Sequence, residues 1–396
     1  MSSVKNGDKP LLLVFPMDMA GHYLRCLELC KRLKDTIQIK FASSTKYGKY
    51  IAASGFETFN VKNFNAEKVT DAASRFDFSW ITRTILENIL DSQIEAIEKN
   101  KPDLVLGDTS FPLKMAAEKT GITFVSLVNG YMTKYYKLVR RAPHNHPAYK
   151  YSEKIPEAIF ERLTRKIEHR AFRKIHEPFR KIRKDRELSP QHYFPDELEG
   201  DFNLICDLPE FFPQKALPAT YEFIGPLYFT DLEREEEILN FLGDHHPNIL
   251  VNMGSTGSRI KESFFNHPVF EKYKIVVSED DNSSLSGSNI ICKPFINNLA
   301  IMNQIDLVVC HGGNGSIYQA LSHGIPVLCF PDNFEQEWNA QRVEELGLGV
   351  LVKNENPIEV AKLMDFWRAR QKRPYFCSDK RKNNVFHGKV HKPKLL

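Results

Sequence analysis

The sequence lacks long apolar runs, paired cysteine motifs and internal repeats, and each absence excludes a class of protein. No stretch of about 18 apolar residues occurs, so we expect no membrane-spanning helix. The 7 cysteines are odd in number, scattered and never spaced C-x-x-C, which argues against a disulfide framework and against a metal-binding finger. No repeat with a period of about 20 to 50 residues is present, which excludes a solenoid. We expect reduced thiols and a cytoplasmic protein.

The chain has 396 residues, of which 42% are hydrophobic. This is long enough for two domains with separate cores. The first ten residues, MSSVKNGDKP, are polar and lead directly into an apolar run, so we expect no signal peptide.

Short apolar runs alternate with helical patterns along most of the chain. This alternation predicts an α/β protein with parallel, doubly wound sheets. Proline and glycine concentrate between residues 209 and 226, where periodicity fails, so a linker is expected there. We predict an N-terminal domain over 1–225, a C-terminal domain over 226–369 and a basic tail over 370–396. The predicted strands cover 9–15, 37–42, 55–61, 102–108, 123–128, 202–206, 248–253, 273–277, 289–292, 306–310 and 326–331.

The most informative stretch is HGGNGSIYQALSHGIPVLCFPDNFEQEWN, which runs from His311 to Asn339. An apolar, β-branched run precedes it, and its three glycines, Gly312, Gly313 and Gly315, allow the backbone to turn sharply and approach a ligand. A helix is expected from Ser316 onward. The first amides and the positive dipole end of such a helix form a site for an anion. A tight turn without a ligand is the alternative interpretation of the glycines alone.

The whole string is more specific than its glycines. His-Gly-Gly-x-Gly-Ser, then Gly-x-Pro, Glu-Gln and Asn-Ala, resembles the donor-binding signature of nucleotide-sugar glycosyltransferases of the GT-B fold. The plant UDP-glycosyltransferases and the bacterial macrolide glycosyltransferases carry it most clearly. The resemblance covers roughly residues 10–34, 100–130 and 248–350. It implies two Rossmann-like domains that face each other across a cleft.

On the donor side, the resemblance implies contacts to the diphosphate. The turn after residues 248–253 supplies Gly254, Ser255 and Thr256, and the glycine loop supplies His311 and Ser316 with the amides between them. Backbone dipole, histidine and hydroxyls would then stabilise the leaving diphosphate. The resemblance therefore implies neither a cofactor nor a metal ion, and the nucleotide sugar is a substrate.

The resemblance also places residues against the base, the ribose and the sugar. Phe295 holds the position of an aromatic side chain that stacks on the base, with Asn298 behind it, but Asn297-Asn298 replaces the usual Pro-Gln and leaves the base open. Gln319 holds the place of a ribose-binding glutamate. Glu335 and Gln336 hold the place of the pair that binds hexose hydroxyls.

On the acceptor side, the resemblance makes His22 the general base. Removing the proton of an attacking hydroxyl is worth about 10²–10⁴-fold in rate, and an unperturbed histidine pKa near 6.5 suits the task. Asp108 ends a strand at the expected carboxyl edge of the sheet and is the candidate partner that orients the imidazole. Asp18, closer in sequence, is the alternative partner.

Positive charge is concentrated in one segment. Residues 134–186 hold 17 Lys and Arg against 6 Asp and Glu, an excess of 11, although the whole chain carries only +4. Apolar residues recur there every three or four positions. A basic amphipathic helix of this kind either lies on an anionic membrane surface or packs its apolar stripe and lines the acceptor site. We favour the packed helix and keep peripheral membrane contact open. No nucleic-acid-binding motif accompanies the charge, so nucleic acid is not expected.

Together these observations predict an inverting glycosyltransferase that moves a hexose from a UDP- or dTDP-sugar to a hydroxyl of a small hydrophobic acceptor. One alternative is a lipid-acceptor transferase at the cytoplasmic membrane face. The other is a nucleotide-sugar-binding subunit without turnover.

Overall fold

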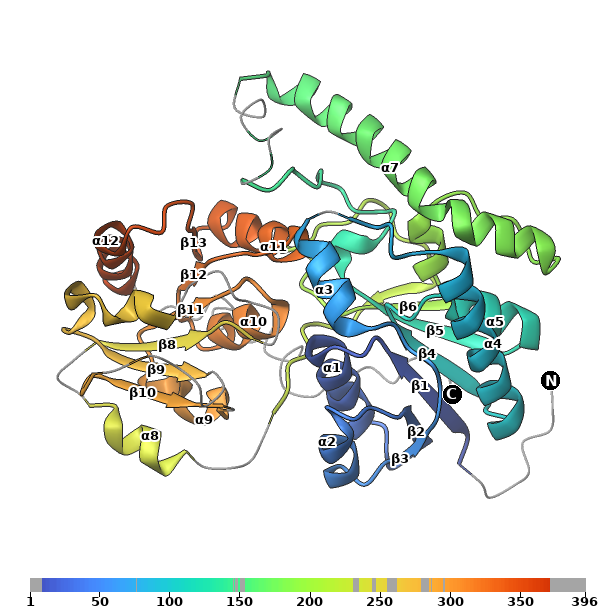
Figure 1. Ribbon diagram of the computed structural model, residues 1–396, viewed down its shortest axis with the longest axis horizontal. Coiled ribbons are helices and arrows are strands. Elements are labelled where there is room, and N and C mark those ends of the chain that lie inside the picture. The colour runs from blue at the N-terminus through green and yellow to red at the C-terminus, as the bar shows by residue number, and fades with distance from the viewer. Residues whose placement is uncertain are drawn as a thin grey trace. The chain divides into compact units, whose positions relative to one another are not determined.

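The chain folds into two compact units, each built on one parallel sheet (Figure 1). Unit 1 comprises residues 1–141 and 151–227, and unit 2 comprises 142–150 and 228–396. The computed structural model describes residues 9–75, 77–144, 146, 149, 154–230, 235–243, 247–254, 262–278, 285, 287–294 and 296–370. The predicted boundary after residue 225 therefore lies two residues before the change of unit at 227/228, and the excursion of 142–150 into unit 2 was not predicted.

The sheet of unit 1 has seven strands in the order β3-β2-β1-β4-β5-β6-β7. All neighbouring pairs are parallel. The central strands are apolar along their whole length because helices cover parallel sheets on both faces. The strands are β1 (Leu11–Pro16), β2 (Gln38–Ala42), β3 (Glu57–Phe59), β4 (Leu104–Asp108), β5 (Thr123–Val128), β6 (Phe202–Ile205) and β7 (Tyr221–Phe223).

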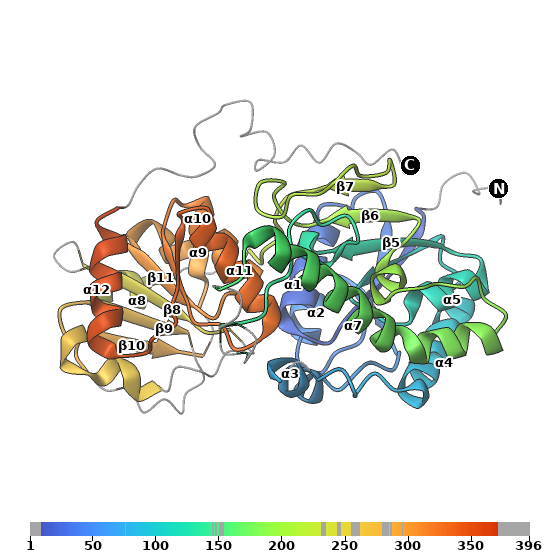
Figure 2. The same cartoon turned by 90° about the horizontal axis from the view of Figure 1, so that it is seen from above.

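The helices of unit 1 include the long basic helix α7. Its last turns contribute Phe179 and Ile182 to a core shared with β1, β4, α4 and α5, and Figure 2 shows α7 running beside α4. The helices are α1 (Ala20–Lys31), α2 (Gly48–Ala53), α3 (Ala66–Ser74), α4 (Arg83–Asn100), α5 (Leu113–Thr120) and α7 (Glu157–Asp185), with 3-10 turns η1 (Gly130–Met132) and η2 (Phe194–Leu198).

The sheet of unit 2 has six parallel strands in the order β10-β9-β8-β11-β12-β13. Its strands are β8 (Asn248–Asn252), β9 (Lys274–Ser278), β10 (Ile290–Lys293), β11 (Leu307–Cys310), β12 (Val327–Cys329) and β13 (Gly349–Leu351). Its helices are α8 (Glu236–Phe241), α9 (Asn298–Ile301), α10 (Asn314–Ser322), α11 (Phe334–Glu345) and α12 (Pro357–Arg368), with 3-10 turns η3 (Glu262–Asn266), η4 (Pro268–Phe270) and η5 (Met302–Gln304).

In each sheet the strand order reverses direction at one place. In unit 1 the reversal falls between β1 and β4, and in unit 2 it falls between β8 and β11. At such a switch point the loops after the two strands part to opposite faces, which leaves a crevice at the carboxyl ends where ligands bind in open α/β sheets. The two switch points are therefore where functional residues are expected.

The structure confirms the predicted parallel α/β architecture. Three elements differ from the prediction. Strand β7 lies within the segment predicted as a linker, strand β13 was not predicted, and helix α7 continues through Pro178. The basic tail from residue 371 lies outside the described residues. Among the residues that the structure describes, no helix has the length and apolarity needed to cross a bilayer.

Candidate active site

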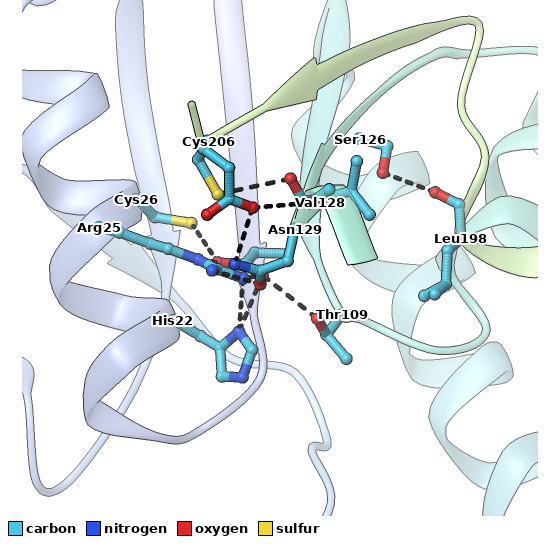
Figure 3. A network of polar contacts seen from close by, with 12 residues as sticks. His22, Arg25, Cys26, Thr109, Ser126, Val128, Asn129, Leu198 and Cys206 are labelled. Carbon is cyan, nitrogen blue, oxygen red and sulfur yellow. Dashed lines mark hydrogen bonds and ion pairs between the residues drawn. The ribbon is translucent and has the colours of Figure 1, made fainter. Parts of the chain in front are cut away.

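His22 and Asp108 meet at the switch point of unit 1. Asp108 ends β4 in register with Pro16 of β1, and His22 lies in the first turn of α1, which follows β1. The His22 Nδ1 atom lies 2.8 Å from Asp108 Oδ1. Because an ionised carboxylate only accepts, Nδ1 carries the proton and Nε2 keeps its lone pair. Figure 3 shows one ring nitrogen in the polar network and the other directed away from it.

The alternative partner, Asp18, is engaged elsewhere. Its Oδ1 accepts a hydrogen bond of 2.7 Å from the Ser44 hydroxyl. The imidazole of His22 therefore has Asp108 as its carboxylate, as one of the two sequence-based hypotheses proposed.

Arg25 holds the other side of the Asp108 carboxylate. Its Nε and Nη2 atoms donate to the two carboxylate oxygens, and Nη2 also lies 3.1 Å from His22 Nδ1. Nη1 donates to Asn129 Oδ1 at 2.7 Å. Asp207 in turn accepts from the Gly130 amide at 2.6 Å and from Asn129 Nδ2 at 3.4 Å. These bonds fix the orientation of the carboxylate that faces His22.

The network is buried, and its charges are shifted accordingly. Burial opposes ionisation of Asp108, whose side chain is fully enclosed, but the Arg25 guanidinium and His22 hold the pKa of this carboxyl well below its usual range. Burial opposes the charge of Arg25 too, and Asp108 outweighs it, so the pKa of Arg25 is raised. Both groups are ionised at physiological pH, and the pair is nearly neutral.

Thr109 follows Asp108 directly and has a left-handed backbone, with φ of 53°. This conformation costs a residue with a Cβ about 1–2 kcal/mol. The Thr109 hydroxyl donates to Asp108 Oδ1 at 3.3 Å. Strain at the residue next to a buried carboxylate is typical of functional sites, where the surrounding structure holds the backbone in place.

Glycines surround the His311 imidazole at the switch point of unit 2. His311 follows β11, and its neighbour strand β8 leads to Gly254. A Cβ atom on Gly254 would lie 2.5 Å from His311 Cε1, and a Cβ on Gly313 would lie 2.5 Å from Nε2. Only glycine fits at these two positions. A Cβ on Gly312, whose φ is 93°, would lie 2.6 Å from the carbonyl oxygen of Gln336.

His311 itself is buried and uncharged. Burial lowers its pKa to about 4, against a smaller opposing effect of a hydrogen bond with the Asn252 backbone. Within the described part of the chain, His311 Nδ1 has no hydrogen-bond partner. Buried polar atoms normally have a partner, so this nitrogen is free to contact a ligand as a neutral imidazole.

The helix α10 begins directly after this loop. Gly313 is its N-cap and supplies no side chain, and the first bond of the helix runs from the Ile317 amide to the Gly313 carbonyl over 3.1 Å. Gly315 is exposed and Ser316 half-buried in the first turn. The first amides of an α-helix are not used by its own ladder, and they attract anions. The predicted cradle of Gly312, Gly313, Gly315 and Ser316 is therefore assembled around one helix N-terminus.

The helix α11 packs against the glycine loop. Asn339 Nδ2 donates to the Gly312 carbonyl at 2.8 Å, and Asn339 is fully buried. Glu335 and Gln336 lie in the first turn of α11. Glu335 is half-buried, whereas Gln336 is buried and its Oε1 accepts from the Asp332 amide at 2.8 Å. Of the predicted sugar-binding pair, Glu335 is the more accessible.

Gln319 and Asn298 contact each other. Asn298 Nδ2 donates to Gln319 Oε1 at 3.1 Å, and Gln319 Nε2 donates to the Phe229 carbonyl at 3.1 Å. Asn298 Oδ1 is buried and has no partner among the described residues. The two predicted nucleoside contacts thus form a buried polar pair. The predicted contacts Ser255, Thr256 and Phe295 lie outside the described residues.

A further contact joins residues far apart in the sequence. In unit 2, the His144 amide donates to Glu337 Oε1 at 3.0 Å, and His144 Nδ1 lies 2.8 Å from Glu337 Oε2. Both side chains are buried. Nearby, Lys353 Nζ donates to the Tyr149 hydroxyl at 2.8 Å. The excursion formed by residues 142–150, which we call the strap, therefore attaches to α11, the helix that carries Glu335.

Comparison with known proteins agrees with this geometry. Residues 274–369 match the family described as erythromycin biosynthesis protein CIII-like, C-terminal domain. The PGL/p-HBAD biosynthesis rhamnosyltransferase of Mycobacterium bovis is 24% identical over 87% of this chain and 77% of its own length. The calicheamicin glycosyltransferase CalG4 superposes with a TM-score of 0.65 at 18% identity, over 91% of this chain and 90% of that one. The chain is thus similar in sequence to glycosyltransferases, and it has the GT-B fold of the solved ones.

A third comparison concerns the nucleotide. The glycosyltransferase VinC, solved in complex with dTDP, superposes on this glycosyltransferase with a TM-score of 0.58 at 16% identity, over 91% of this chain and 92% of VinC. At this identity the likeness establishes the fold. The fold of the glycosyltransferase thus agrees with the two-domain architecture that its donor signature predicted.

Four residues that contribute to these sites were not predicted to do so. Arg25 orients Asp108, Asp207 accepts from the Asn129 side chain that contacts Arg25, Asn339 holds the glycine loop, and His144 holds α11. Only Asn339 gave a signal, as part of the Asn-Ala pair that closes the donor signature. The others act through contacts between distant parts of the sequence.

Proposed function

We propose that this glycosyltransferase transfers a hexose from a UDP- or dTDP-sugar to a hydroxyl group of a small hydrophobic acceptor, with inversion at the anomeric carbon. The observation that carries the proposal is the contact between His22 and the buried Asp108 at a switch point, in which His22 Nδ1 is bound to the carboxylate. A histidine held in this tautomer presents a basic nitrogen, which is what an attacking hydroxyl requires.

In the proposed step, the acceptor oxygen attacks the anomeric carbon while His22 Nε2 takes the hydroxyl proton. The bond from the anomeric carbon to the diphosphate breaks, and the nucleoside diphosphate leaves with the electron pair. Asp108 faces the imidazolium that forms and stabilises its charge. Direct displacement from the face opposite the leaving group accounts for inversion.

The donor side of the proposal rests on the cradle of unit 2. Negative charge develops on the diphosphate as the bond breaks, and preorganised donors at that position are worth about 3 kcal/mol each. The amides of the first turn of α10 and the Ser316 hydroxyl supply such donors. The dTDP bound in the VinC structure supports a pyrimidine nucleoside diphosphate as the ligand.

The first test replaces His22 by Ala. We expect kcat/KM for transfer to fall by about 10²–10⁴-fold because the general base is lost. Binding of UDP or dTDP should be unchanged, since the proposed nucleotide contacts lie in unit 2. The measurement is release of nucleoside diphosphate from UDP-hexoses and dTDP-hexoses with a panel of phenols and alcohols, with calorimetry for the nucleotide.

Asp108→Asn gives a weaker test by itself, because it leaves Arg25 as a buried cation without its counter-charge. Breaking a buried pair in this way costs about 3–5 kcal/mol. The matched control is the double variant Arg25→Gln with Asp108→Asn, which should regain stability but not the rate. Wild-type turnover in His22→Ala, or transfer by no member of the panel with the wild-type enzyme, would refute the proposal.

Metal independence is a second part of the proposal. If the dipole of α10, His311 and Ser316 carry the charge of the leaving diphosphate, a divalent cation has no role in the step. We expect the initial rate to remain within about two-fold after dialysis against EDTA, and Mg²⁺ or Mn²⁺ to restore nothing further. A rate that collapses with EDTA and returns with Mg²⁺ would contradict this account of the donor site.

A second candidate function is transfer to an acceptor carried on a lipid. The observation that favours it is the exposed aliphatic and basic face of α7, described below. A panel that pairs each free phenol with the same phenol on an acyl chain separates the two functions. Preference for the acylated member only when vesicles are present would favour the second.

A further inference from the structure

The first half of α7 exposes three aliphatic side chains. Ile159 is 59% exposed, Leu163 46% and Ile167 58%. They follow one another at four-residue spacing, so they form a continuous stripe along the helix. Single exposed aliphatic residues are normal on a protein surface. Three exposed aliphatic residues in one stripe are unusual. They make up half of the six large hydrophobic side chains that are exposed in the described part of the chain.

Cations are interleaved with this stripe. At about 100° per residue, the three aliphatic positions and the cationic positions fall within one arc of about 140°. No acidic residue between 157 and 174 falls within that arc. We call this surface the outer face of α7; its residues are Ile159, Arg162, Leu163, Lys166, Ile167, Arg170, Arg173 and Lys174.

The opposite side of α7 accounts for its packing. Phe179 and Ile182 are fully buried in the core of unit 1, with Phe172 and Ile175 packed against them. The outer face is therefore not needed to hold the helix on its unit. The packed-helix hypothesis from the sequence accounts for the buried side of α7 and leaves the exposed stripe of its first half unexplained.

The charges of the outer face are not neutralised within the protein. Two of the three acidic residues between 157 and 174 pair with arginines that precede α7: Glu157 with Arg141, and Glu168 with Arg140. Among the described residues, the five cations of the outer face have no acidic partner. Five cations and three aliphatic side chains thus share one solvent-facing surface.

We propose that the outer face of α7 docks on an anionic lipid bilayer. The five cations match a surface of anionic headgroups, and the three aliphatic side chains insert into the headgroup region below them. The charge alone would suit a nucleic acid or an acidic protein, but a polyanion in water gives no environment for the aliphatic stripe. A bilayer accommodates both features at once.

The test is cosedimentation of the whole protein with vesicles. We expect binding to vesicles of phosphatidylcholine with phosphatidylglycerol, and little binding to phosphatidylcholine alone. Binding should weaken as NaCl rises, because the Debye length falls from about 10 Å at 0.1 M to about 3 Å at 1 M. The assay contains neither donor nor acceptor, so its outcome does not depend on the proposed reaction.

Two variants separate charge from insertion. The triple variant Arg162→Gln, Lys166→Gln, Arg170→Gln should lose affinity by about 100-fold, at about five-fold per cation. The triple variant Ile159→Ser, Leu163→Ser, Ile167→Ser keeps every charge and should still lose at least about ten-fold, because the inserted surface is gone. All six side chains face solvent, so thermal unfolding should match the wild type.

The matched control removes the same charge from unit 1 outside α7. The triple variant Lys34→Gln, Lys99→Gln, Lys119→Gln changes three exposed lysines that lie after α1, in α4 and in α5. It should bind vesicles like the wild type. No binding to anionic vesicles, equal losses in the control, or full binding by the serine variant would each overturn the proposal. Failure to bind vesicles together with capture of an acidic protein would assign the face to that partner.

Discussion

Arg25 changes what the neighbouring histidine and aspartate can do. In an isolated pair, the aspartate charge is balanced only when the histidine gains a proton. Here the guanidinium already balances Asp108 and lies 3.1 Å from His22 Nδ1. Asp108 therefore holds the imidazole in one tautomer while both of its oxygens also accept from Arg25.

At the same scale, His311 couples folding to pH. Its pKa in the folded protein is about 4, against about 6.5 for a histidine in an unfolded chain. The folded pKa lies below the unfolded one, so the stability from the neutral ring is complete above about pH 6.5. It is lost as pH falls from there toward 4. As the pH falls from about 8 to 5, protonation of this histidine in the unfolded chain should lower the free energy of unfolding by about 2 kcal/mol. The variant His311→Asn should lack that part of the pH dependence.

Urea unfolding followed by tryptophan fluorescence measures this change. Trp80 is the tryptophan of unit 1, so in a Trp80→Phe background the remaining signal, from Trp338 and Trp367, reports on unit 2. His267→Asn is the control: this exposed histidine caps η4 with its side chain, and Asn also serves as a cap. Identical pH dependence in wild type and His311→Asn would show that the ring is not neutral in the folded protein.

At the scale of elements, the strap and α11 form one unit of structure. His144 contacts Glu337 through its amide and its ring, and Gln341 Nε2 adds a contact of 3.2 Å to the same carboxylate. Glu337 lies two residues after Glu335 in α11. The position of the predicted sugar contact therefore depends on a residue nearly 200 positions earlier in the chain, since His144 and Glu337 are separated by 193 residues.

We predict that His144→Ala raises the KM for the sugar nucleotide by about three- to ten-fold, because Glu337 loses a buried partner worth about 1 kcal/mol or more. Affinity for the free nucleoside diphosphate should not change, since its proposed contacts belong to β8, β11 and α10. Initial rates against donor concentration and calorimetry with UDP or dTDP measure the two quantities.

The control for this prediction is Tyr149→Phe, which removes the hydroxyl bound by Lys353 in the same strap but makes no contact with Glu337. It should leave the donor KM unchanged. An equal loss of sugar nucleotide and nucleoside diphosphate affinity in His144→Ala would mean that the strap supports the whole unit and not α11 in particular.

Much of the element pattern could be predicted from the sequence. Apolar runs of five or six residues predicted β1, β4 and β5 because a strand buried on both faces needs no alternation. The missed strands β7 and β13 have three residues each, too few for any periodicity. Of these, β7 also lies among the prolines that indicated a linker. Pro178 suggested a break in α7, yet packing of Phe179 and Ile182 holds the helix together.

At the scale of the whole molecule, each candidate site lies at the switch point of one sheet, at the carboxyl ends of its strands. The proximity of His22 and Asp108 could be predicted because Asp108 ends β4 and His22 begins the helix after β1, two strand ends that parallel topology brings to one edge. The glycine loop could be predicted because its string is specific. Arg25 could not, since an arginine on an amphipathic helix normally faces water, and its partner Asp108 lies 83 residues away. Gln319 and Gln336 were predicted as ligand contacts, yet both oxygens accept hydrogen bonds inside the protein.

The strap also limits how this chain can be divided. A cut at 227/228 looks natural from the order of the two sheets, but it leaves residues 142–150 with the first fragment. The second fragment would then carry the buried Glu337 carboxylate without His144. A chimera that takes residues 228–396 from a related protein meets the same difficulty in reverse, because the incoming α11 must accept a strap encoded within the first 227 residues. The two parts of this chain are therefore not freely exchangeable.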